Sequence, residues 1–293
     1  MQRYCCQNCG AYFTSKKRKN YSQELFKKYI WHKQTIKELS STYKKSKRWI
    51  KYTLEKYEII IKQKQPRKMV AIVDSTFFGK RIDQFGVSVI IDAHKKESVL
   101  WKYIDTEKSF YYAFMRRELE QQGFEFLAVV VDGSRPLLKA FPNIPVQLCH
   151  FHQKAIIRRY LTKNPKLPAS IHLKQLTDTL GFIDKKEFEY LFKRYLIHWE
   201  YFLKEKTFNP ETKRWLYTHK QLRSAVRSIK TNLPYLFTYQ DYPELNIPNT
   251  TNLLDGGVFS FLKRLLKNHN GLSRNFKKKL IDEILENQFS EKR

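Results

Sequence analysis

Two apolar runs stand out in the middle of the chain, and an aspartate closes each of them. Residues 69–73 read MVAIV and precede Asp74, and residues 126–131 read FLAVVV and precede Asp132. Short continuous apolar runs of this kind predict strands that are buried on both faces. A carboxylate at the end of a buried strand is costly unless a cation or a proton compensates it. The pattern therefore marks both aspartates as candidate functional residues.

The pattern around these runs predicts a mixed α/β core. Residues 85–91 and 98–104 are rich in β-forming side chains, and the polar segment 94–97 between them supplies a turn. Residues 109–122 follow a helical period, and residues 142–148 offer a further short strand. Three strands followed by a helix, a strand, a helix and a strand is the order of a ribonuclease H-like fold. We therefore expect an α/β fold with a central sheet and a ribonuclease H-like catalytic core.

A helix-turn-helix DNA-binding region is expected before this core. Residues 21–58 repeat apolar positions every three or four residues, which is typical of helices. Within this segment, a short helix at 35–40, a turn and a second helix at 44–57 match the motif. The second helix carries basic residues near its start, where a recognition helix presents side chains to the major groove: Lys44, Lys45, Lys47, Arg48 and Lys51. The alternative is a small helical bundle whose basic face is only solvated.

After the core strands the pattern becomes helical again. Residues 150–245 are rich in aromatic side chains and too long for a loop, so we expect an all-α insertion in the core. Trp199 and Trp215 lie in this insertion, where they either stack on bases or pack in its interior. Residues 256–285 predict a basic amphipathic helix. Its apolar side holds Phe259, Leu262, Leu265 and Leu266, and its basic side holds Lys263, Arg264 and Lys267.

The charge of the chain indicates a polyanionic partner. Its 293 residues include 56 Lys and Arg against 28 Asp and Glu, a formal net charge of +28. Residues 1–68 hold 19 of these cations and 4 of these acids, so this segment alone carries +15. Nucleic acid and an anionic membrane both fit, but no apolar run approaches the ~20 residues that span a bilayer. The N-terminus lacks the apolar stretch of a signal peptide, so we expect a soluble, intracellular protein. A lysine-rich proteome is the alternative source of part of the charge.

Three of the four cysteines lie together near the N-terminus. Cys6 and Cys9 frame a turn that ends at Gly10, as in one knuckle of a zinc ribbon, and Cys5 stands beside them. A structural zinc site needs four ligands, so a second knuckle would have to lie upstream of this one. The spacing leaves two interpretations open, a zinc site and a metal-free turn. Because the fourth cysteine, Cys149, stands alone, the pattern does not predict a disulfide framework.

A third candidate acid, Asp255, precedes two glycines far downstream. Together with Asp74 and Asp132 it offers the carboxylate oxygens that Mg²⁺ prefers. Two divalent ions about 3.5–4 Å apart promote phosphodiester cleavage by activating the attacking oxygen and stabilising the leaving oxygen. Taken singly, each acid has a simpler explanation, because Asp caps helices and forms turns at strand ends. The three acids in this strand order, in so basic a chain, favour a metal-dependent site that acts on nucleic acid.

These features in combination resemble the Mutator-like superfamily of DDE transposases. The resemblance rests on Asp74, on Asp132, on the step Cys149-x2-His152, and on a late acid followed by two glycines and a basic helix. It extends over essentially the whole chain.

The N-terminal segment adds to the resemblance. Bacterial insertion-sequence transposases with an N-terminal zinc ribbon often carry a segment of the form RYxCxxCGxxF, which residues 3–13 match with one additional cysteine, Cys5. The missing second knuckle departs from this pattern and is typical of a truncated or degenerate copy. Zn²⁺ at Cys6 and Cys9 is what the resemblance implies for this segment.

The resemblance implies that Asp74, Asp132 and Asp255 are catalytic and hold two Mg²⁺ ions, with Mn²⁺ as a substitute. Asp255 stands where the family usually has Glu, so its carboxylate reaches one methylene less far. Cys149 and His152 are family markers, for which we expect packing and hydrogen bonding near the site. The implied activity is cleavage of terminal inverted repeats and strand transfer into target DNA. The implied partners are double-stranded DNA and further copies of the chain, and the implied location is the cytoplasm of a bacterium, on its nucleoid.

We therefore expect five segments. They are a partial zinc-ribbon knuckle (1–17), the helix-turn-helix region (18–68), the first part of the core (69–160), the helical insertion (161–246) and a core completion that carries the third acid and the basic helix (247–293). Two other functions remain open. One is a decayed or domesticated DNA-binding protein derived from a transposase, and the other is a metal-dependent nuclease without strand transfer.

Overall fold

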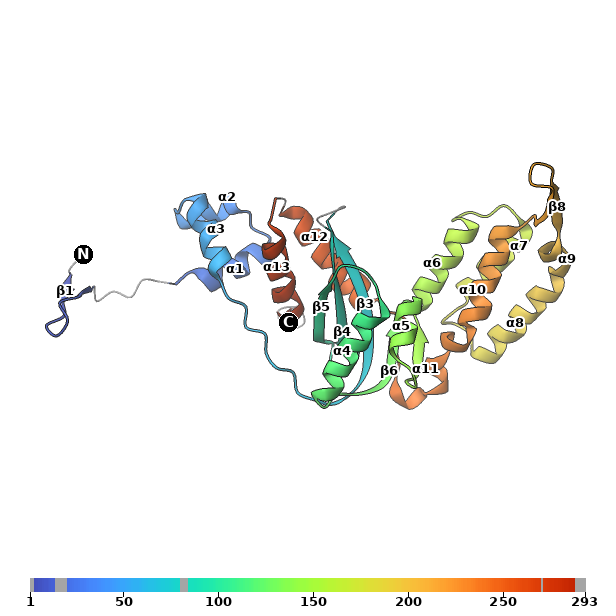
Figure 1. The fold of residues 1–293 in the computed structure, drawn as a ribbon, viewed down its shortest axis with the longest axis horizontal. Coiled ribbons are helices and arrows are strands. Elements are labelled where there is room, and N and C mark those ends of the chain that lie inside the picture. The colour runs from blue at the N-terminus through green and yellow to red at the C-terminus, as the bar shows by residue number, and fades with distance from the viewer. Residues whose placement is uncertain (1–2, 14–19, 80–83, 270, 288–293) are drawn as a thin grey trace. The chain divides into compact units, whose positions relative to one another are not determined.

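The computed structural model describes residues 3–13, 20–79, 84–269 and 271–287 (Figure 1). Contacts within the chain divide it into two compact units. The first comprises Met1–Ile61 and Arg264–Ile284, and the second comprises Lys62–Lys263 and Leu285–Arg293. In the stretches that the structure describes, no helix combines the length and the apolar character that crossing a membrane requires.

A five-stranded mixed sheet forms the centre of the second unit. Its strands are β3 (Lys68–Phe78), β4 (Phe85–Asp92), β5 (Glu97–Ile104), β6 (Glu125–Val131) and β7 (Val146–Leu148), in the spatial order β5-β4-β3-β6-β7. β4 lies antiparallel to both β3 and β5, whereas β3, β6 and β7 run parallel to one another. Helix α4 (Ser109–Gln121) connects β5 to β6, and helix α5 (Arg135–Ala140) connects β6 to β7. The predicted mixed α/β class and the predicted order of strands and helices are confirmed.

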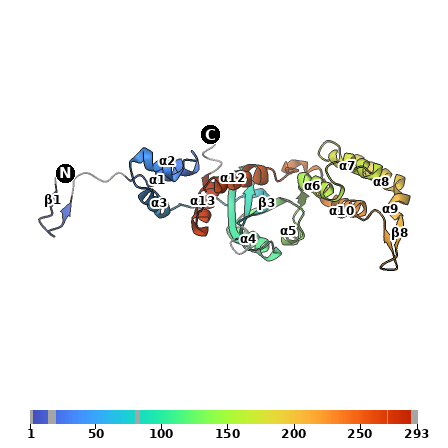
Figure 2. The ribbon, with the colours of Figure 1, turned by 90° about the horizontal axis from the view of Figure 1, so that it is seen from above.

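Alternate residues of the central strands face opposite sides of the sheet, as the strand period requires. Met69, Ala71 and Val73 of β3 belong to a buried cluster with Tyr112 and Met115 of α4. Helix α4 thus covers one face of the sheet (Figure 2). The intervening residues of β3 lie on the other face, and η3 (Leu253–Phe259) packs against β3.

A helical region follows β7 and shares the buried cluster of the sheet. It comprises α6 (His150–Leu161), α7 (Pro168–Asp178), α8 (Lys185–His198), α9 (Glu200–Lys204), α10 (Lys220–Leu236), α11 (Thr238–Asp241) and η2 (Pro243–Leu245). The prediction of an all-α insertion is wrong in one respect. Strands β8 (Lys206–Asn209) and β9 (Arg214–Tyr217) form an antiparallel hairpin within it. Both strands are largely exposed, so the hairpin shows no apolar alternation by which the sequence could reveal it. Trp199 packs against the buried cluster, whereas Trp215 is exposed on β9.

The first unit contains a short hairpin of β1 (Tyr4–Cys5) and β2 (Tyr12–Phe13), followed by α1 (Ser22–Ile30), α2 (Ile36–Tyr43) and α3 (Lys47–Lys56). The two helices expected at 35–40 and 44–57 are present with shifted bounds. Lys44 adopts a left-handed conformation (φ 51°) that ends α2, and Ser46 caps α3 by accepting the backbone N–H of Trp49. Lys44 and Lys45 therefore lie in the connection and not on the second helix. Residues 14–19, at the predicted boundary between knuckle and helices, lie outside the described residues.

The end of the chain is divided differently from the expected core completion at 247–293. Helix α12 (Ser260–Asn268) is amphipathic as predicted, with Leu262, Leu265 and Leu266 buried and Lys263, Arg264 and Lys267 exposed. Phe259, the last residue of η3, is buried as well. Helix α13 (Arg274–Asn287) follows it. Residues 264–284 group with α1–α3, because the apolar side of α13 supplies part of the core of the first unit.

Candidate functional site

The first two predicted acids lie on one face of the sheet at the same height. In the parallel pair of β3 and β6, Ile72 is the partner of Val130. Two residues further along each strand, this register brings Asp74 beside Asp132, and the strand period keeps both on the face opposite α4. One detail of the prediction is wrong. Asp74 lies inside β3 and not at its end, because β3 continues to pair with β4 as far as Phe78.

Cys149 occupies the next place in the same row. In the parallel pair of β6 and β7, Val130 is the partner of Gln147, so the register brings Cys149 beside Asp132. The backbone N–H of Cys149 donates to the carbonyl of Val131 across 2.8 Å, which holds it at the edge of β6. The row Asp74, Asp132, Cys149 therefore crosses three parallel strands.

The carboxyl group of Asp74 is deeply buried, with 6% of the residue exposed. Burial, followed by the negative charge of Asp132, raises the pKa of Asp74 from 3.8 to about 7, and Asp255 adds to this effect. The backbone N–H of Ser75, which donates to Asp74 Oδ1 across 2.7 Å, and the positive charge of His152 act in the opposite direction. Asp74 thus interacts electrostatically with both of the other predicted acids, Asp132 and Asp255.

Asp132 is half-buried in the turn after β6. Its Oδ1 accepts the backbone N–H of Ser134 across 2.7 Å, and Gly133 between them has φ +89°, which suits glycine. Asp132 therefore stabilises the turn after β6, which is the simpler explanation that its sequence context offered. It also lies beside Asp74. A further acid, Glu107, stands near it. Desolvation, followed by the charge of Asp132, raises the pKa of Glu107.

Asp255 lies in the first turn of η3, a helix with π-type hydrogen bonds. The backbone N–H of Gly257 donates to the carbonyl of Asn252 across 3.0 Å, five residues back. A Cβ on Gly256 would collide with the Asn252 side chain, which would have to move to admit any larger residue. Asn252 and not Asp255 occupies the N-cap position, so the helix-cap explanation of Asp255 is wrong. The carboxylate of Asp255 is left half-buried and acts on Asp74.

Cys149 and His152 meet the loop that leads to Asp255. The backbone N–H of Thr251 donates to Cys149 Sγ across 3.2 Å, and the Thr251 hydroxyl donates to the same sulfur across 3.4 Å. The Thr251 hydroxyl also lies 3.4 Å from His152 Nδ1, and the Thr251 carbonyl accepts the backbone N–H of Asp255 across 3.1 Å. Cys149 and His152 therefore hold the start of η3 through Thr251.

His152 is the cation of this group. A hydrogen bond with Cys149, opposed by burial and supported by the charges of Asp74 and Asp132, raises the pKa of His152 to about 9. Burial raises the pKa of the Cys149 thiol, but the hydrogen bonds from His152 and Thr251 outweigh it and leave that pKa below its usual value. At neutral pH His152 is therefore an imidazolium that interacts with Asp74 and Asp132.

Sequence reasoning missed Thr251 and Glu107. Thr251 belongs to the polar run NTTN, in which nothing distinguishes it from Thr250. Glu107 lies in a polar segment between a strand and a helix, where an acid is ordinary. Only the folded arrangement relates them to the acids, so no local pattern could have identified them.

The donor set suits a hard divalent cation, because it consists of carboxylates whose mutual repulsion such a cation would relieve. However, across residues 3–13, 20–79, 84–269 and 271–287, no three His, Cys, Asp or Glu side chains are arranged to hold a metal ion.

At the N-terminus, Cys6 and Cys9 lie in the turn of the β1–β2 hairpin. Backbone N–H groups of Cys9 and Asn8 lower the pKa of Cys6. These two thiols do not by themselves complete a tetrahedral zinc site.

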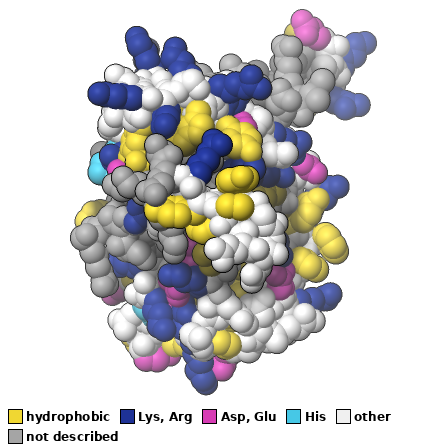
Figure 3. Space-filling model, turned by 90° about the vertical axis from the view of Figure 1, so that its left-hand side faces the viewer, with side chains coloured by type: hydrophobic (Ala, Val, Ile, Leu, Met, Phe, Trp, Pro, Cys, Tyr) yellow, Lys and Arg dark blue, Asp and Glu magenta, His cyan; other side chains and the backbone are white. Residues whose placement is uncertain are grey.

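The predicted DNA-binding cations are exposed on both units. Lys47, Arg48 and Lys51 line a hollow in the first unit, whereas Lys44 and Lys45 do not. Lys263, Arg264 and Lys267 project from α12. Lys and Arg side chains are spread over the face of the molecule drawn in Figure 3.

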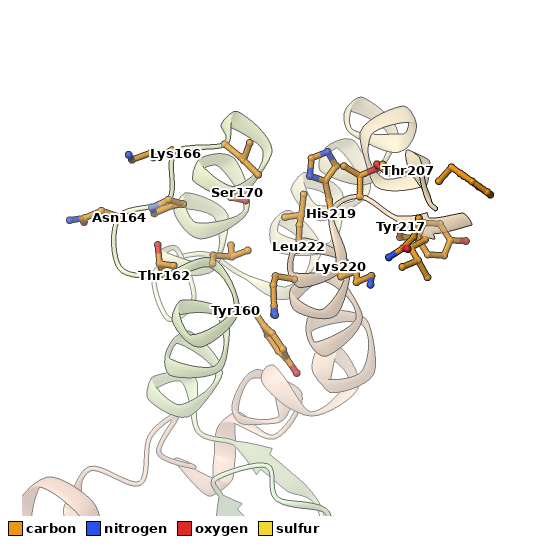
Figure 4. Close-up of a pocket in the computed structure, with 18 of the residues that line it drawn as sticks. Tyr160, Thr162, Asn164, Lys166, Ser170, Thr207, Tyr217, His219, Lys220 and Leu222 are labelled. Carbon is orange, nitrogen blue, oxygen red and sulfur yellow. The ribbon is translucent and has the colours of Figure 1, made fainter. Parts of the chain in front are cut away.

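A cavity of about 1050 Å³ lies in the helical region, between the α6–α7 connection and the β8–β9 hairpin (Figure 4). None of the predicted site residues lines it.

The fold and the acidic group define a mixed α/β protein with carboxylates on one face of its parallel strands. No protein-family model matches the chain, and no curated protein matches it. The chain has a weak structural likeness, at a TM-score of 0.22 and 10% sequence identity, to the Mos1 transposase paired-end complex with left transposon end. The match covers 76% of this chain and 79% of that chain.

Proposed function

We propose that this protein is a DDE-type transposase with a ribonuclease H-like core. The observation that supports the proposal is the electrostatic interaction of Asp74 with Asp132 and with Asp255, which come from three distant parts of the sequence. A buried carboxyl group with a pKa near neutrality is typical of functional sites. The formal net charge of +28 makes a polyanion the matching substrate.

In this proposal the three aspartates hold Mg²⁺, or Mn²⁺ in its place, which would stabilise the negative charge that develops on the phosphodiester. Two neighbouring side chains, His152 and Thr251, would assist the three aspartates. His152 supplies a fixed positive charge beside Asp74 and Asp132. Thr251 holds the start of η3, the helix from which Asp255 acts electrostatically on Asp74.

The proposed reaction has two steps. In the first, the oxygen of a water molecule bonds to phosphorus, the bond from phosphorus to the 3′-oxygen breaks, and the 3′-oxygen takes a proton. In the second, the oxygen of the freed 3′-hydroxyl gives up its proton and bonds to a phosphorus of target DNA, the bond from that phosphorus to a 3′-oxygen breaks, and this 3′-oxygen takes a proton. The helices α1–α3 would bind double-stranded transposon ends, and copies of the chain would act together on DNA.

The test is nicking of a supercoiled plasmid that carries the DNA flanking the coding sequence, with Mg²⁺ or Mn²⁺ as the added metal. We expect the wild-type protein to nick the plasmid, and Asp132→Asn and Asp74→Asn to abolish nicking. Asp241→Asn is the matched control, because Asp241 is an exposed acid of the same unit in a surface ion pair with Lys185. Nicking that survives in Asp132→Asn would disprove the metal-site proposal.

One observation favours a second candidate, a DNA-binding protein derived from such an enzyme. In the described residues no group of acids is arranged to hold a metal, and Asp255 is shorter than the glutamate of the resembling family. The two candidates separate in the same experiment. The binding protein binds DNA and leaves the plasmid supercoiled with either metal, whether or not its acids are intact.

A further inference from the structure

The first unit is built from an N-terminal segment, Met1–Ile61, and from a second segment, Arg264–Ile284, which we call the C-terminal segment. Helices α1, α2 and α3 have 9, 8 and 10 residues, which is too short for stability in isolation. Phe276 of α13 packs with its ring centroid 6.5 Å from that of Phe26 and 6.1 Å from that of Tyr29, both on α1. The C-terminal segment therefore completes the core on which the N-terminal helices depend.

The same segment also satisfies the carbonyl ends of two of these helices. The His269 Nε2–H donates to the carbonyl of Tyr29 near the end of α1 across 3.2 Å, and the two rings stack at 3.9 Å. The Lys279 ammonium donates to the carbonyls of Glu55 at 2.7 Å and Leu54 at 3.4 Å, at the end of α3. Carbonyls in the last turn of a helix lack partners within the helix, so a cation there stabilises it.

A hollow of about 570 Å³ lies where the two chain ends meet. Its basic side comes from the first turn of α2 and the first turns of α3, with Lys37, Lys47, Arg48 and Lys51. Its other side comes from the C-terminal segment, with Asn268, His269 and Leu272. We call this the basic hollow.

The cations of the basic hollow have no anionic partner among the residues that the structure describes. All four are exposed, and none forms an ion pair with another described residue. No residue that lines the hollow is acidic. The nearest acid in sequence, Glu38, is held by Thr35, whose backbone N–H donates to it across 2.7 Å. Four like charges gathered around one depression repel one another and favour an anion at its centre.

We infer that the basic hollow seats the phosphate backbone of duplex DNA, and that the C-terminal segment is a structural part of the DNA-binding surface. The inference rests on the proposed function, since it deepens how the protein holds its DNA. Phosphates of a duplex repeat along each strand, so cations from α2 and α3 can engage neighbouring phosphates of one strand. Contacts of this kind fix the register and orientation of a protein on DNA.

The test measures binding of the full-length protein to a duplex by fluorescence anisotropy, without divalent metal, over a series of KCl concentrations. The double substitution Lys47→Gln with Arg48→Gln should weaken binding and make the slope of log K against log salt shallower. The change should be about 0.9 for each phosphate that the variant no longer neutralises. Lys56→Gln is the matched control, because Lys56 is an exposed cation at the other end of α3 and does not line the hollow. It should leave the slope unchanged.

A pair of substitutions at the exposed Asn268 tests the C-terminal side. Asn268→Glu places a negative charge on that wall, where it repels a nearby phosphate, and should weaken binding about tenfold or more, which corresponds to about 1.4 kcal/mol or more. Asn268→Gln should bind as the wild type does. Equal binding by Asn268→Glu and the wild type would overturn the role of the C-terminal segment.

The outcomes also separate this inference from the proposed function. If the protein binds the duplex with the predicted slopes but never nicks DNA, the inference about the basic hollow stands and the catalytic proposal is contradicted. If the protein nicks DNA but the Lys47 and Arg48 substitutions leave binding unchanged, the catalytic proposal stands and the inference about the basic hollow is contradicted. Tighter binding of a duplex RNA of the same sequence would overturn the assignment of DNA as the occupant.

Discussion

The backbone N–H of Thr251 donates to the sulfur of Cys149 across 3.2 Å, although 101 residues separate the two in the sequence. Cys149 follows β7 in the row of Asp74 and Asp132, and Thr251 accepts the N–H of Asp255. This hydrogen bond therefore ties the loop of the third acid to the strands of the first two. Cys149 and His152 thus hold that loop in place through Thr251, which is a structural role near the candidate site.

Thr251→Val is expected to reduce nicking while the protein stays folded. The substitution keeps the branched shape and the backbone N–H but removes the hydroxyl shared by Cys149 and His152. The free energy of unfolding should fall by about 1 kcal/mol. Thr251→Ser keeps the hydroxyl and serves as the control. Equal nicking rates for the valine and serine variants would show that the hydroxyl does not position Asp255.

The stability of the protein should depend on pH through Asp74. The pKa of this carboxyl is about 7 in the folded chain against 3.8 for the ordinary group, so the folded state holds the proton more tightly than the unfolded state does. Stability therefore declines as the pH rises between these two values, and the decline is complete above about 7. Asp74→Asn removes the charge and should stabilise the metal-free protein above that pH by up to about 4 kcal/mol.

The measurement is the free energy of unfolding in urea for the wild type and Asp74→Asn at several pH values. Below the ordinary pKa of 3.8 the two proteins should be equally stable. Added Mg²⁺ should stabilise the wild type above neutral pH and leave Asp74→Asn unchanged. A wild-type stability that rises steadily between acidic and neutral pH, relative to that of the variant, has the wrong sign for a buried, repelled carboxyl.

The sheet could be predicted because its signal is local. Continuous apolar runs such as 126–131 and the polar turn at 94–97 set the strands and their order, and parallel strands then bring Asp74 and Asp132 to one face. The exposed hairpin of β8 and β9 could not be predicted in this way. Its stability comes from backbone pairing and from contacts such as that of Phe208 with Trp215, whose ring centroids lie 5.5 Å apart.

The packing of the chain ends could not be predicted either. The amphipathic pattern of α13 shows that the helix needs a partner but not which one, and its partner α1 lies more than 240 residues earlier. The relation of Thr251 to Cys149 is of the same kind. Contacts between distant segments depend on the whole fold, whereas the periods that predict strands and helices can be recognised within a short stretch of consecutive residues.

The length of the third acid can be tested directly. Asp255→Glu lengthens the side chain by one methylene in a wide helical turn and should nick DNA at least as fast as the wild type. Asp255→Asn keeps the length of aspartate but removes the charge that would bind metal in the proposed site, so its nicking rate should fall by about 100-fold or more. Nicking by Asp255→Asn at the wild-type rate would place the third acid elsewhere, and Glu107 would be the next candidate because of its coupling to Asp132.

The N-terminal knuckle should not hold a full equivalent of zinc in a single chain. The described residues near the β1–β2 turn offer the thiols of Cys6 and Cys9, and Cys5 Sγ is directed to the carbonyl of Gly10 at 3.5 Å. A tetrahedral structural site needs four ligands. Metal analysis of the purified protein should therefore give well under one zinc per chain. One zinc per chain that disappears in Cys6→Ser would contradict this prediction.

Phe276→Ala should unfold the first unit without disturbing the sheet. The side chain is 7% exposed between two aromatic rings of α1, and truncation of a buried phenylalanine costs about 3–5 kcal/mol. Phe110→Ala is the matched control, because Phe110 is 69% exposed and its truncation should cost little. Hydrogen exchange followed by mass spectrometry should show faster exchange in α1, α3 and α13 of Phe276→Ala and unchanged exchange in β3 and β6. Protection of α1 that equals that of the wild type would mean that the N-terminal helices are stable without the C-terminal segment, because that segment could then not be supplying their core.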